Sequence, residues 1–473
     1  IIMKKYSVPP IFSNTCNNSP DKPSNIVSDP YCVVSGLSYP DHIIEVPGSK
    51  SITNRALMIA ALADGRSTLN GVLFSDDSRH FLQCLTDLGF DLEISEEEKT
   101  VSILGLGGKM PVCEAEINVG SAGTAARFLT AILGCSKGVW HLDSSDQMKR
   151  RPMKPLLDAL KSLGCRVVCH EEEDHFPFTI YSDGITADEV TVDITGSSQF
   201  LSALLMSSVI TGRDFKINIT GSHGMAYIDM TIKLMQQFGV SPEMINNAGT
   251  IASVCGYTEH EKSVCIIPGD SHYNSRFFQI EPDVSAASYF YAMAAVSGRS
   301  FLVRHVHFDS LQGDIQFVRL LENMGCAACD TEEGLIIKGP KAGKIKGVSA
   351  DLGSFSDQTL TLAAIAPFAD GPVTIRNIGH IRLQECDRIE AACHNLKMMG
   401  IKTEVFTEKD NECIRIWPGE PKPAEIETYN DHRVAMAFTV TGLRAAGIRI
   451  LDPMCCRKTF ETFYSVLKER IIQ

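Results

Sequence analysis

The sequence predicts an α/β protein built from six copies of one unit, because two series of helices alternate along its 473 residues. In the first series a helix ends in an apolar residue followed by glycine, at positions 89, 164, 239, 325 and 400, which are 75, 75, 86 and 75 residues apart. A period near 75 residues with two helices and several short strands is too long for a solenoid repeat. It suits a compact α/β unit that is used repeatedly.

The second series consists of apolar helices, rich in small residues, that stop at glycine and lead into a β-type run. Six of them are present, and they are apolar on nearly all sides. We therefore expect them to be buried, with the sheets outside them. They cover residues 55–65, 124–134, 198–212, 286–298, 357–371 and 432–447.

Most helices of the second series begin with Ser, Thr, Asp, His or Arg, at residues 51–55, 121–124, 197–199, 357 and 431–433. Ser, Thr and Asp are ordinary N-cap residues, so capping explains them taken singly. Arginine is not a cap residue, and Arg55, Arg127 and Arg433 lie where a cation opposes the helix dipole. If these helix starts converge, we expect them to attract an anionic ligand.

The segment PGSKSITNR, residues 47–55, places two cations in a turn that opens the first helix of this series. Free backbone N–H groups, three hydroxyl side chains and the charges of Lys50 and Arg55 are suited to holding an anion. For this segment taken alone, a capped surface helix with solvated Lys and Arg would explain the same residues.

Length and composition indicate a globular protein of two or three domains, since 44% of the residues are hydrophobic. The net charge of −13 opposes a broad attraction to nucleic acid or to anionic lipid. The 16 cysteines lack a disulfide-framework spacing, and no signal core or bilayer-spanning run is found, so we expect a cytoplasmic protein. Residues 1–35 are rich in Ser, Asn, Pro and Asp and are expected to form a loose tail.

Nine motifs stand out along the chain: PGSKSITNRAL from residue 47, GSAGTAARFLTA from 120, RRPMKPLLDAL from 150, SSQFLSALLM from 197, YIDMTIKLM from 227, DVSAASYF from 283, ECDRI from 385, NDHRVAMAF from 430 and RKTF from 457. Together they closely resemble the enolpyruvyl transferases, from about Val46 to Tyr464. The resemblance implies an α/β fold with two lobes, an inside-out α/β barrel in which each lobe holds three β-α-β-α-β-β units. It places lobe I at residues 36–48 and 282–473 and lobe II at 49–281, with closure of the lobes on the ligands.

The resemblance also implies a reaction and its residues. The enolpyruvyl group of phosphoenolpyruvate would pass to the 5-hydroxyl of shikimate 3-phosphate with release of phosphate, a step of the pathway to chorismate, without a metal or organic cofactor and in a monomer. Asp357 would accept the hydroxyl proton, and Glu385 and Lys50 would assist at phosphoenolpyruvate. Residues implied for phosphoenolpyruvate are Lys50, Gly123, Arg151, Gln199, Arg388, Arg433 and Lys458. Residues implied for shikimate 3-phosphate are Lys50, Ser51, Arg55, Ser197, Ser198, Gln199, Tyr227, Asp357, His380 and Gln384.

Two residues of these motifs, Glu385 and Arg127, allow a second interpretation. Glu385 could simply form an ion pair with Arg388 at i and i+3 on one helix face, and Arg127 could bind a ligand or support its neighbours. Gly123 lacks a Cβ, so the backbone can come close to phosphoenolpyruvate, which also leaves room for its mimic glyphosate.

Four positions depart from the commonest family pattern, in which Lys stands at 384, Ser at 224 and Asn at 380 and 121. Two of these, Gln384 and Gly224, remove a cation and a hydroxyl expected at the shikimate phosphate. We expect His380 or His223 to replace part of the missing contacts and Gln384 to hydrogen-bond the phosphate. A transferase acting on another cyclitol acceptor is therefore the main competing hypothesis.

Two further hypotheses are less favoured. A transferase acting on UDP-N-acetylglucosamine would carry a cysteine shortly before Arg151, and the stretch DSSDQMKRR has none. A non-catalytic anion-binding relative would be expected to lack Asp357, Glu385 or Lys458, and all three are present.

Overall fold

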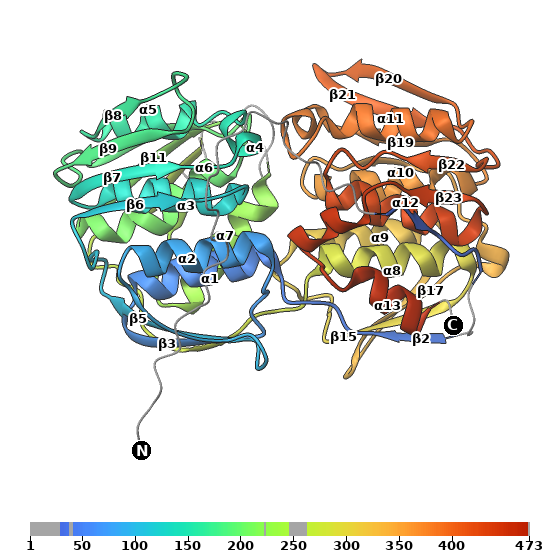
Figure 1. The fold of residues 1–473 in the computed structure, drawn as a ribbon, viewed down its shortest axis with the longest axis horizontal. Coiled ribbons are helices and arrows are strands. Elements are labelled where there is room, and N and C mark those ends of the chain that lie inside the picture. The colour runs from blue at the N-terminus through green and yellow to red at the C-terminus, as the bar shows by residue number, and fades with distance from the viewer. Residues whose placement is uncertain (1–28, 37–40, 222–223, 246–262, 472–473) are drawn as a thin grey trace, which may run out of the picture.

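The computed structural model describes residues 29–36, 41–221, 224–245 and 263–471, which form two lobes side by side (Figure 1). Each lobe has its own hydrophobic core. One core contains buried residues between Ile52 and Ile280, and we call this half lobe II. The other contains Val33, Ile44 and residues from Val284 to Ile471, and we call it lobe I. None of the helices in the described part of the chain is long and apolar enough to span a bilayer.

Lobe II contains three four-stranded sheets, in the orders β14-β3-β5-β4, β6-β7-β9-β8 and β10-β11-β13-β12. Its strands are β3 (Asp64–Asn70), β4 (Asp91–Ser95), β5 (Thr100–Leu106), β6 (Glu114–Asn118), β7 (Gly138–Asp143), β8 (Arg166–Cys169), β9 (Phe178–Ser182), β10 (Glu189–Asp193), β11 (Phe215–Thr220), β12 (Glu243–Ile245), β13 (Ser263–Ile267) and β14 (Phe277–Gln279). Its helices are α1 (Lys50–Leu62), α2 (Asp76–Asp87), α3 (Gly123–Cys135), α4 (Asp146–Lys149), α5 (Lys154–Ser162), α6 (Gln199–Ser207) and α7 (Met225–Gln237).

Lobe I contains the sheets β16-β17-β15-β2 and β18-β19-β21-β20 and the three-stranded sheet β1-β23-β22. Its strands are β1 (Tyr31–Cys32), β2 (Asp41–Ile44), β15 (Ser300–Arg304), β16 (Ala327–Thr331), β17 (Gly334–Lys338), β18 (Ser349–Asp351), β19 (Val373–Arg376), β20 (Thr403–Glu408), β21 (Asn411–Ile416), β22 (Ala424–Ile426) and β23 (Ile448–Ile450). Its helices are α8 (Val284–Ser297), α9 (Gln316–Asn323), α10 (Thr359–Ile365), α11 (Arg388–Met398), α12 (His432–Arg444) and α13 (Phe463–Arg470).

The four-stranded sheets share one pairing pattern, which confirms the predicted repeat. In β6-β7-β9-β8, for example, β6 and β7 are parallel and the other neighbours are antiparallel. The sheet β10-β11-β13-β12 repeats this arrangement, as does β18-β19-β21-β20. The three-stranded sheet keeps the parallel pair, β22 with β23, and one antiparallel neighbour, β1. The glycines that close the first helix series all have a positive φ, between +77° and +105°, as expected directly beyond a helix.

The apolar helices of the second series are buried, as predicted. Every residue of α3 is buried, as is every residue of α8 except Ser297 and every residue of α12 except Arg444. A helix can bury its whole surface only when other elements surround it, and here the sheets lie on the outside of the helices (Figure 1). The polar residues at the starts of these helices therefore lie at the ends of an apolar core.

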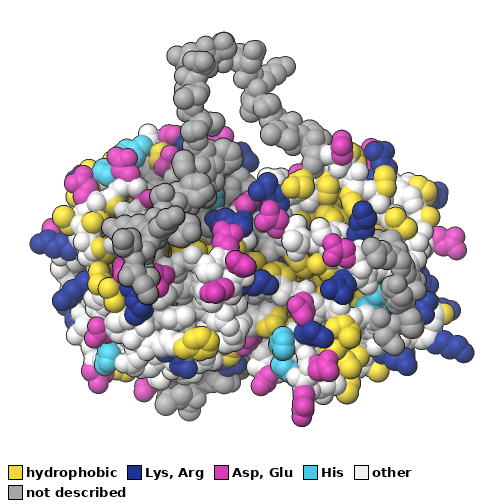
Figure 2. All heavy atoms as spheres, turned by 60° about the horizontal axis from the view of Figure 1, so that its bottom comes forward, with side chains coloured by type: hydrophobic (Ala, Val, Ile, Leu, Met, Phe, Trp, Pro, Cys, Tyr) yellow, Lys and Arg dark blue, Asp and Glu magenta, His cyan; other side chains and the backbone are white. Residues whose placement is uncertain are grey.

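The outer surface carries charges of both signs. On the face that Figure 2 shows, Lys and Arg side chains lie among Asp and Glu side chains. Together with the net charge of −13, this mixing opposes a broad attraction to polyanions. A site for small anions must therefore be built locally, from cations gathered in one place.

The chain passes between the lobes twice, and the two passages are paired. Gly48 and Pro282 form an antiparallel bridge. On either side of it Ser49 N donates to the Glu281 carbonyl at 2.8 Å, and Asp283 N donates to the Pro47 carbonyl at 2.8 Å. A Cβ on Gly48 would lie 2.0 Å from the Gly71 carbonyl oxygen, so only glycine fits there. As a result β2 joins a sheet of lobe I and β14 joins a sheet of lobe II.

The expected loose tail over residues 1–35 is corrected at its end. Residues 1–28 lie outside the described part of the chain, but Tyr31 and Cys32 form β1, antiparallel to β23. Val33 is buried, and a Cβ on Gly442 would lie 2.7 Å from the Val33 Cβ, so the missing side chain of Gly442 makes room for Val33. The segment is ordered because it pairs with an otherwise open sheet edge and buries an apolar side chain.

Candidate active site

A cavity of about 210 Å³ lies between the lobes. Of the residues that the sequence nominated for binding or catalysis and that the structure describes, all line it except Lys458. Lobe II contributes Lys50, Ser51, Arg55, Gly123, Arg151, Ser197, Ser198, Gln199 and Tyr227, and lobe I contributes Asp357, His380, Gln384, Glu385, Arg388 and Arg433.

Five of the six buried helices present their first turn to this cavity. Lys50 opens α1, Gly123 opens α3, Gln199 opens α6 and Arg433 lies in the first turn of α12, while Asp357 lies in the 3₁₀ turn Ser356–Gln358 that leads into α10. The sixth helix, α8, is linked to the site by its N-cap residue Asp283, whose Oδ2 accepts from Lys50 N at 3.4 Å. Several positive helix ends therefore act on one enclosed volume.

The arginines of lobe II at this cavity have no ion pair with any described residue. Arg55 is 1% exposed and donates only to neutral oxygens, among them Thr231 Oγ1 at 2.7 Å and Ser202 Oγ at 3.2 Å. Arg127 is 3% exposed and donates to the backbone. The Nε atoms of Arg127 and Arg151 have no hydrogen-bond partner in the described part of the chain. Burial lowers the pKa of Arg55 to about 10. Burial, followed by the charge of Arg151, lowers the pKa of Arg127 well below its usual value.

A buried cation without a counter-ion is unfavourable, because the protein interior solvates charge poorly. An anion bound in the cavity would relieve this cost for several arginines at once. The lobe II wall is therefore suited to binding phosphate and carboxylate groups, which guanidinium groups recognise in a bidentate manner.

The lobe I wall has the opposite character, because its cations are already paired with carboxylates. Arg388 is 1% exposed and forms ion pairs with Asp357 at 2.9 Å, Glu385 at 2.8 Å and Asp431 at 2.8 Å. Arg433 Nη2 lies 2.8 Å from Asp357 Oδ2. The i, i+3 ion pair that was the second interpretation of Glu385 is thus present, and Glu385 also lines the cavity.

These contacts hold both carboxyl groups ionised. Burial alone would raise the pKa of Glu385, but Arg388, Lys458, Arg151 and Lys50 together lower it well below its ordinary value. Burial acts the same way on Asp357, and Arg433 and Arg388 outweigh it, so the pKa of Asp357 is lowered. The proton affinity of each carboxyl group, and with it proton transfer, therefore depends on how many of these cations a bound ligand engages.

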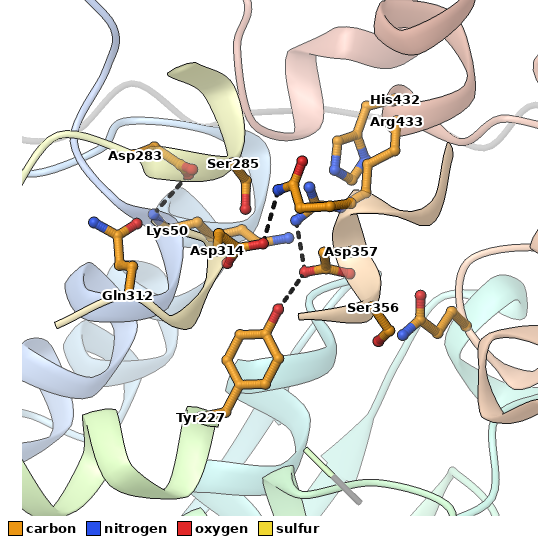
Figure 3. A network of polar contacts seen from close by, with 12 residues as sticks. Lys50, Tyr227, Asp283, Ser285, Gln312, Asp314, Ser356, Asp357, His432 and Arg433 are labelled. Atoms are coloured by element: carbon orange, nitrogen blue, oxygen red, sulfur yellow. Dashed lines mark hydrogen bonds and ion pairs between the residues drawn. The ribbon is translucent and has the colours of Figure 1, made fainter. Parts of the chain in front are cut away.

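Direct contacts between the lobes border the cavity. The Tyr227 hydroxyl from α7 donates to Asp357 Oδ2 at 2.7 Å (Figure 3). On another side, Gln147 Nε2 from α4 donates to the Glu385 carbonyl at 3.2 Å. Each proposed acid or base on lobe I thus has a contact with lobe II.

Lys458 lies beside Glu385 and is not among the residues that line the cavity. It ends the 3₁₀ segment Pro453–Lys458, and its Nζ is 3.7 Å from Glu385 Oε1 without a hydrogen-bond partner among the described residues. From this position the ammonium group of Lys458 acts on the site in two ways: by the effect of its charge on Glu385, and by its N–H groups, which make no hydrogen bond to a described residue.

Sequence reasoning missed three neighbours of the site. His432 is 1% exposed and neither ring nitrogen has a hydrogen-bond partner among the described residues; burial, then Lys50 and Arg433, lower its pKa well below the usual value, so it is neutral. Asp77 pairs with Lys50 at 3.5 Å. Asp314 is buried beside Asp357 (Figure 3). Of the three, only His432 could have been found from the sequence, because it stands inside the NDHR motif between a helix cap and Arg433.

The unusual residues at the expected shikimate phosphate have local explanations. Gly224 has φ +66°, and a Cβ there would lie 2.6 Å from Ser198 Oγ, so a serine would require a shift of the loop. Gln384 Oε1 accepts from Arg388 Nη1, and His380 Nε2 lies 2.7 Å from Ser356 Oγ. Gln384 and His380 both line the cavity, whereas His223 lies outside the described residues.

Comparisons with known proteins agree with this geometry. The family model of EPSP synthase (3-phosphoshikimate 1-carboxyvinyltransferase) matches residues 38–467. A 3-phosphoshikimate 1-carboxyvinyltransferase of Nostoc punctiforme is 40% identical over 90% of this chain and 95% of its own length.

Two solved structures share the fold. EPSP synthase from Acinetobacter baumannii has a TM-score of 0.73 at 22% identity and covers 93% of this chain and 99% of its own. The enolpyruvyl transferase NikO from Streptomyces tendae has a TM-score of 0.66 at 15% identity and covers 93% of this chain and 96% of its own. The match of the family model to nearly the whole chain, together with the identity to the Nostoc protein, shows that this protein belongs to the EPSP synthase family.

Proposed function

We propose that this protein transfers the enolpyruvyl group of phosphoenolpyruvate to the 5-hydroxyl of shikimate 3-phosphate. The observation that carries the proposal is the enclosed cavity in which Arg55, Arg127 and Arg151 have no ion pair with a described residue, opposite the carboxylates of Asp357 and Glu385. Two substrates that each bear a phosphate and a carboxylate supply the missing negative charge. The family to which the chain belongs supports the same reaction.

The reaction needs one addition and one elimination. The 5-oxygen of shikimate 3-phosphate bonds to C2 of phosphoenolpyruvate and loses its proton, while C3 gains a proton to become a methyl group. Phosphate then leaves C2, and C3 loses a proton, which restores the double bond in the enol ether product. Proton transfers at two different atoms, the 5-oxygen and C3, therefore call for two groups with different environments.

Asp357 takes the proton from the 5-hydroxyl, and Glu385 with Lys50 serves the C3 carbon. Shikimate 3-phosphate is held by Ser51, Arg55, Ser197 and Tyr227, together with Ser198, Gln199, His380 and Gln384. Phosphoenolpyruvate is held by Arg151, Arg388, Arg433 and Lys458, with Gly123 allowing close approach of the backbone.

Binding of the anions prepares the acid and the base. When phosphoenolpyruvate engages Arg151 and Lys458, these cations stabilise the ionised form of Glu385 less, so its pKa rises and it can carry a proton. When Arg433 turns toward the substrate, Asp357 loses one of the groups that lower its pKa and becomes a stronger base. Alignment of two bound reactants and electrostatic stabilisation supply the rest of the rate.

Phosphate release tests the proposal. The purified protein is incubated with phosphoenolpyruvate and shikimate 3-phosphate, and in parallel with phosphoenolpyruvate and unphosphorylated shikimate. We expect release with the first pair, at least about 100-fold slower release in Asp357→Asn, where the base is lost, and normal release in Asp330→Asn, which pairs with His307 away from the cavity. Release with shikimate alone would support a different acceptor and overturn the proposal.

The acceptor phosphate can be tested separately because Gln384 and His380 line the cavity. If they contact that phosphate, Gln384→Ala and His380→Ala raise the KM for shikimate 3-phosphate by about 10- to 100-fold, as expected for loss of a hydrogen bond to a charged group. The KM for phosphoenolpyruvate serves as the internal control. Unchanged KM values for shikimate 3-phosphate in both variants would refute this assignment.

A further inference from the structure

Asp314 is a buried carboxyl group beside Asp357 that the chemistry above does not use. It lies in the 3₁₀ turn Gly313–Ile315 and is 3% exposed. Gln358 Nε2 donates to Asp314 Oδ1 at 2.7 Å, and Gln358 is the residue directly after Asp357. A single hydrogen bond therefore ties Asp314 to the backbone that carries Asp357.

The turn that carries Asp314 also touches the passage between the lobes. Gln312 Nε2 donates to the Pro282 carbonyl at 2.7 Å, and its Oε1 accepts from Val284 N at 3.0 Å. On the other side, a Cβ on Gly313 would lie 2.5 Å from the Ala226 Cβ, so the turn packs directly against the start of α7. Asp314 thus lies where the paired passages, lobe II and Asp357 meet.

Charged and titratable groups reach Asp314 from several elements. Asp357 and Asp283 are negative, Arg433 is positive, and Tyr227 from α7 is a neutral hydroxyl that also bonds to Asp357. Burial, followed by the charge of Asp357, raises the pKa of Asp314 to about 7, and Arg433 opposes this rise. The neighbouring Asp357 has a lowered pKa, so the two carboxyl groups differ in proton affinity.

We propose that Asp314 is a positioning residue that controls the basicity of Asp357 through the charge it carries. While Asp314 is protonated, Asp357 is surrounded by Arg388, Arg433 and the Tyr227 hydroxyl, which all favour its ionised form and make it a weak base. When Asp314 loses its proton, the added negative charge increases the proton affinity of Asp357. Asp357 then accepts the substrate hydroxyl proton more readily. This inference rests on the proposed function, in which Asp357 is the base.

The pH dependence of turnover tests it. Asp314→Asn keeps an oxygen that accepts from Gln358 but cannot ionise. We expect the ratio of kcat between the parent protein and this variant to be near one at about pH 6 and to rise to about tenfold at about pH 8.5. The control Asp330→Asn, away from the cavity, should give a constant ratio. A constant ratio for Asp314→Asn, or one that falls with pH, would overturn the inference, since a purely structural role would change kcat equally at every pH.

A second readout does not depend on catalysis. Because Asp314 binds its proton more tightly in the folded than in the unfolded chain, the stability that this group contributes to the parent protein is lost as pH rises toward 7, and Asp314→Asn has no such contribution to lose. The urea midpoint of the variant minus that of the parent should therefore increase between about pH 5 and pH 7 and then stay constant. An equal midpoint difference at all pH values would show that Asp314 does not titrate and would overturn the inference. An inactive parent protein would refute the proposed function as well, whereas a constant kcat ratio in an active parent refutes this inference alone.

Discussion

Tyr227 and Asp357 are joined by a hydrogen bond of 2.7 Å, although they belong to different lobes and are 130 residues apart in the chain. Burial, followed by the charges of Asp314 and Asp357, raises the pKa of Tyr227 well above its ordinary value, so its hydroxyl remains a donor. The same carboxylate oxygen accepts from Arg433 Nη2 at 2.8 Å. The Oδ2 atom of Asp357 therefore accepts from one group of each lobe, while Arg388 holds Oδ1 at 2.9 Å, so the geometry of the carboxylate depends on how the lobes meet.

Removing the Tyr227 hydroxyl should lower the catalytic activity more than the stability of the folded protein. In Tyr227→Phe the ring remains, but the carboxylate of Asp357 loses a donor worth about 1.5–3 kcal/mol, so kcat/KM for shikimate 3-phosphate should fall about 10- to 100-fold. Steady-state kinetics measures this, with Tyr181→Phe as the control, because the Tyr181 ring stacks under Arg166, with the guanidinium carbon 3.7 Å from the ring centre, and does not line the cavity. Equal kcat/KM values for Tyr227→Phe and the parent protein would contradict a role for the hydroxyl.

When no anion is bound, the Arg127 side chain should lower the stability of the folded protein. When phosphoenolpyruvate is present, the same side chain should contribute to its binding. Replacing it in Arg127→Met removes a buried charge that has no ion pair with a described residue, so we expect the free energy of unfolding to rise by about 1–3 kcal/mol. The KM for phosphoenolpyruvate should rise at least about tenfold in the same variant. Urea unfolding and kinetics measure the two effects, with the exposed Arg166→Met as control. A variant that is less stable and binds normally would show that Arg127 has a structural role only.

Gly123 offers a test of the phosphoenolpyruvate site with a matched control. A Cβ at Gly123 would lie 2.5 Å from Arg151 Nη1 and 3.0 Å from Arg127 Nη1, so Gly123→Ala must displace a guanidinium group. We expect the KM for phosphoenolpyruvate to rise about tenfold or more, with a smaller change for shikimate 3-phosphate. Gly196 lines the same cavity and a Cβ there meets nothing within 4 Å, so Gly196→Ala should leave both KM values nearly unchanged. Similar KM changes in the two variants would count against the proposed position of the substrate.

His432 should make the folded protein sensitive to mild acid. Its pKa is lowered by burial in the folded state, so below about pH 6.5 the unfolded chain binds a proton that the folded chain does not. Stability therefore falls with decreasing pH, by up to about 1.4 kcal/mol per pH unit from this group. Urea midpoints between about pH 5 and pH 7.5 should decline less steeply in His432→Asn than in the parent, while the exposed His272→Asn follows the parent. Parallel plots of urea midpoint against pH for His432→Asn and the parent would show that His432 does not cause this pH dependence.

The sequence by itself determined the repeated unit and the types of residue at the site. A period of about 75 residues and helices apolar on all sides leave few ways to bury those helices except inside a shell of sheets. The nominated residues stand at or near helix starts, which sequence patterns locate well, so nearly all of them line the cavity. The composition of residues 1–35 predicts a loose tail, and the order of the segment Tyr31 to Val33 has no local signal because its pairing partner, β23, is more than 400 residues away in the chain.

Only the tertiary structure decided which charges are balanced and which are not. The sequence offers Arg388 one carboxylate, Glu385, yet Arg388 meets three carboxylates while Arg55 meets only neutral oxygens among the described residues. The proton affinities of Asp357 and Asp314 likewise depend on the meeting of α7, α12 and the turn at Gly313–Ile315. Burial and the distances between charges set these properties, and both arise from packing of segments that are far apart in the chain.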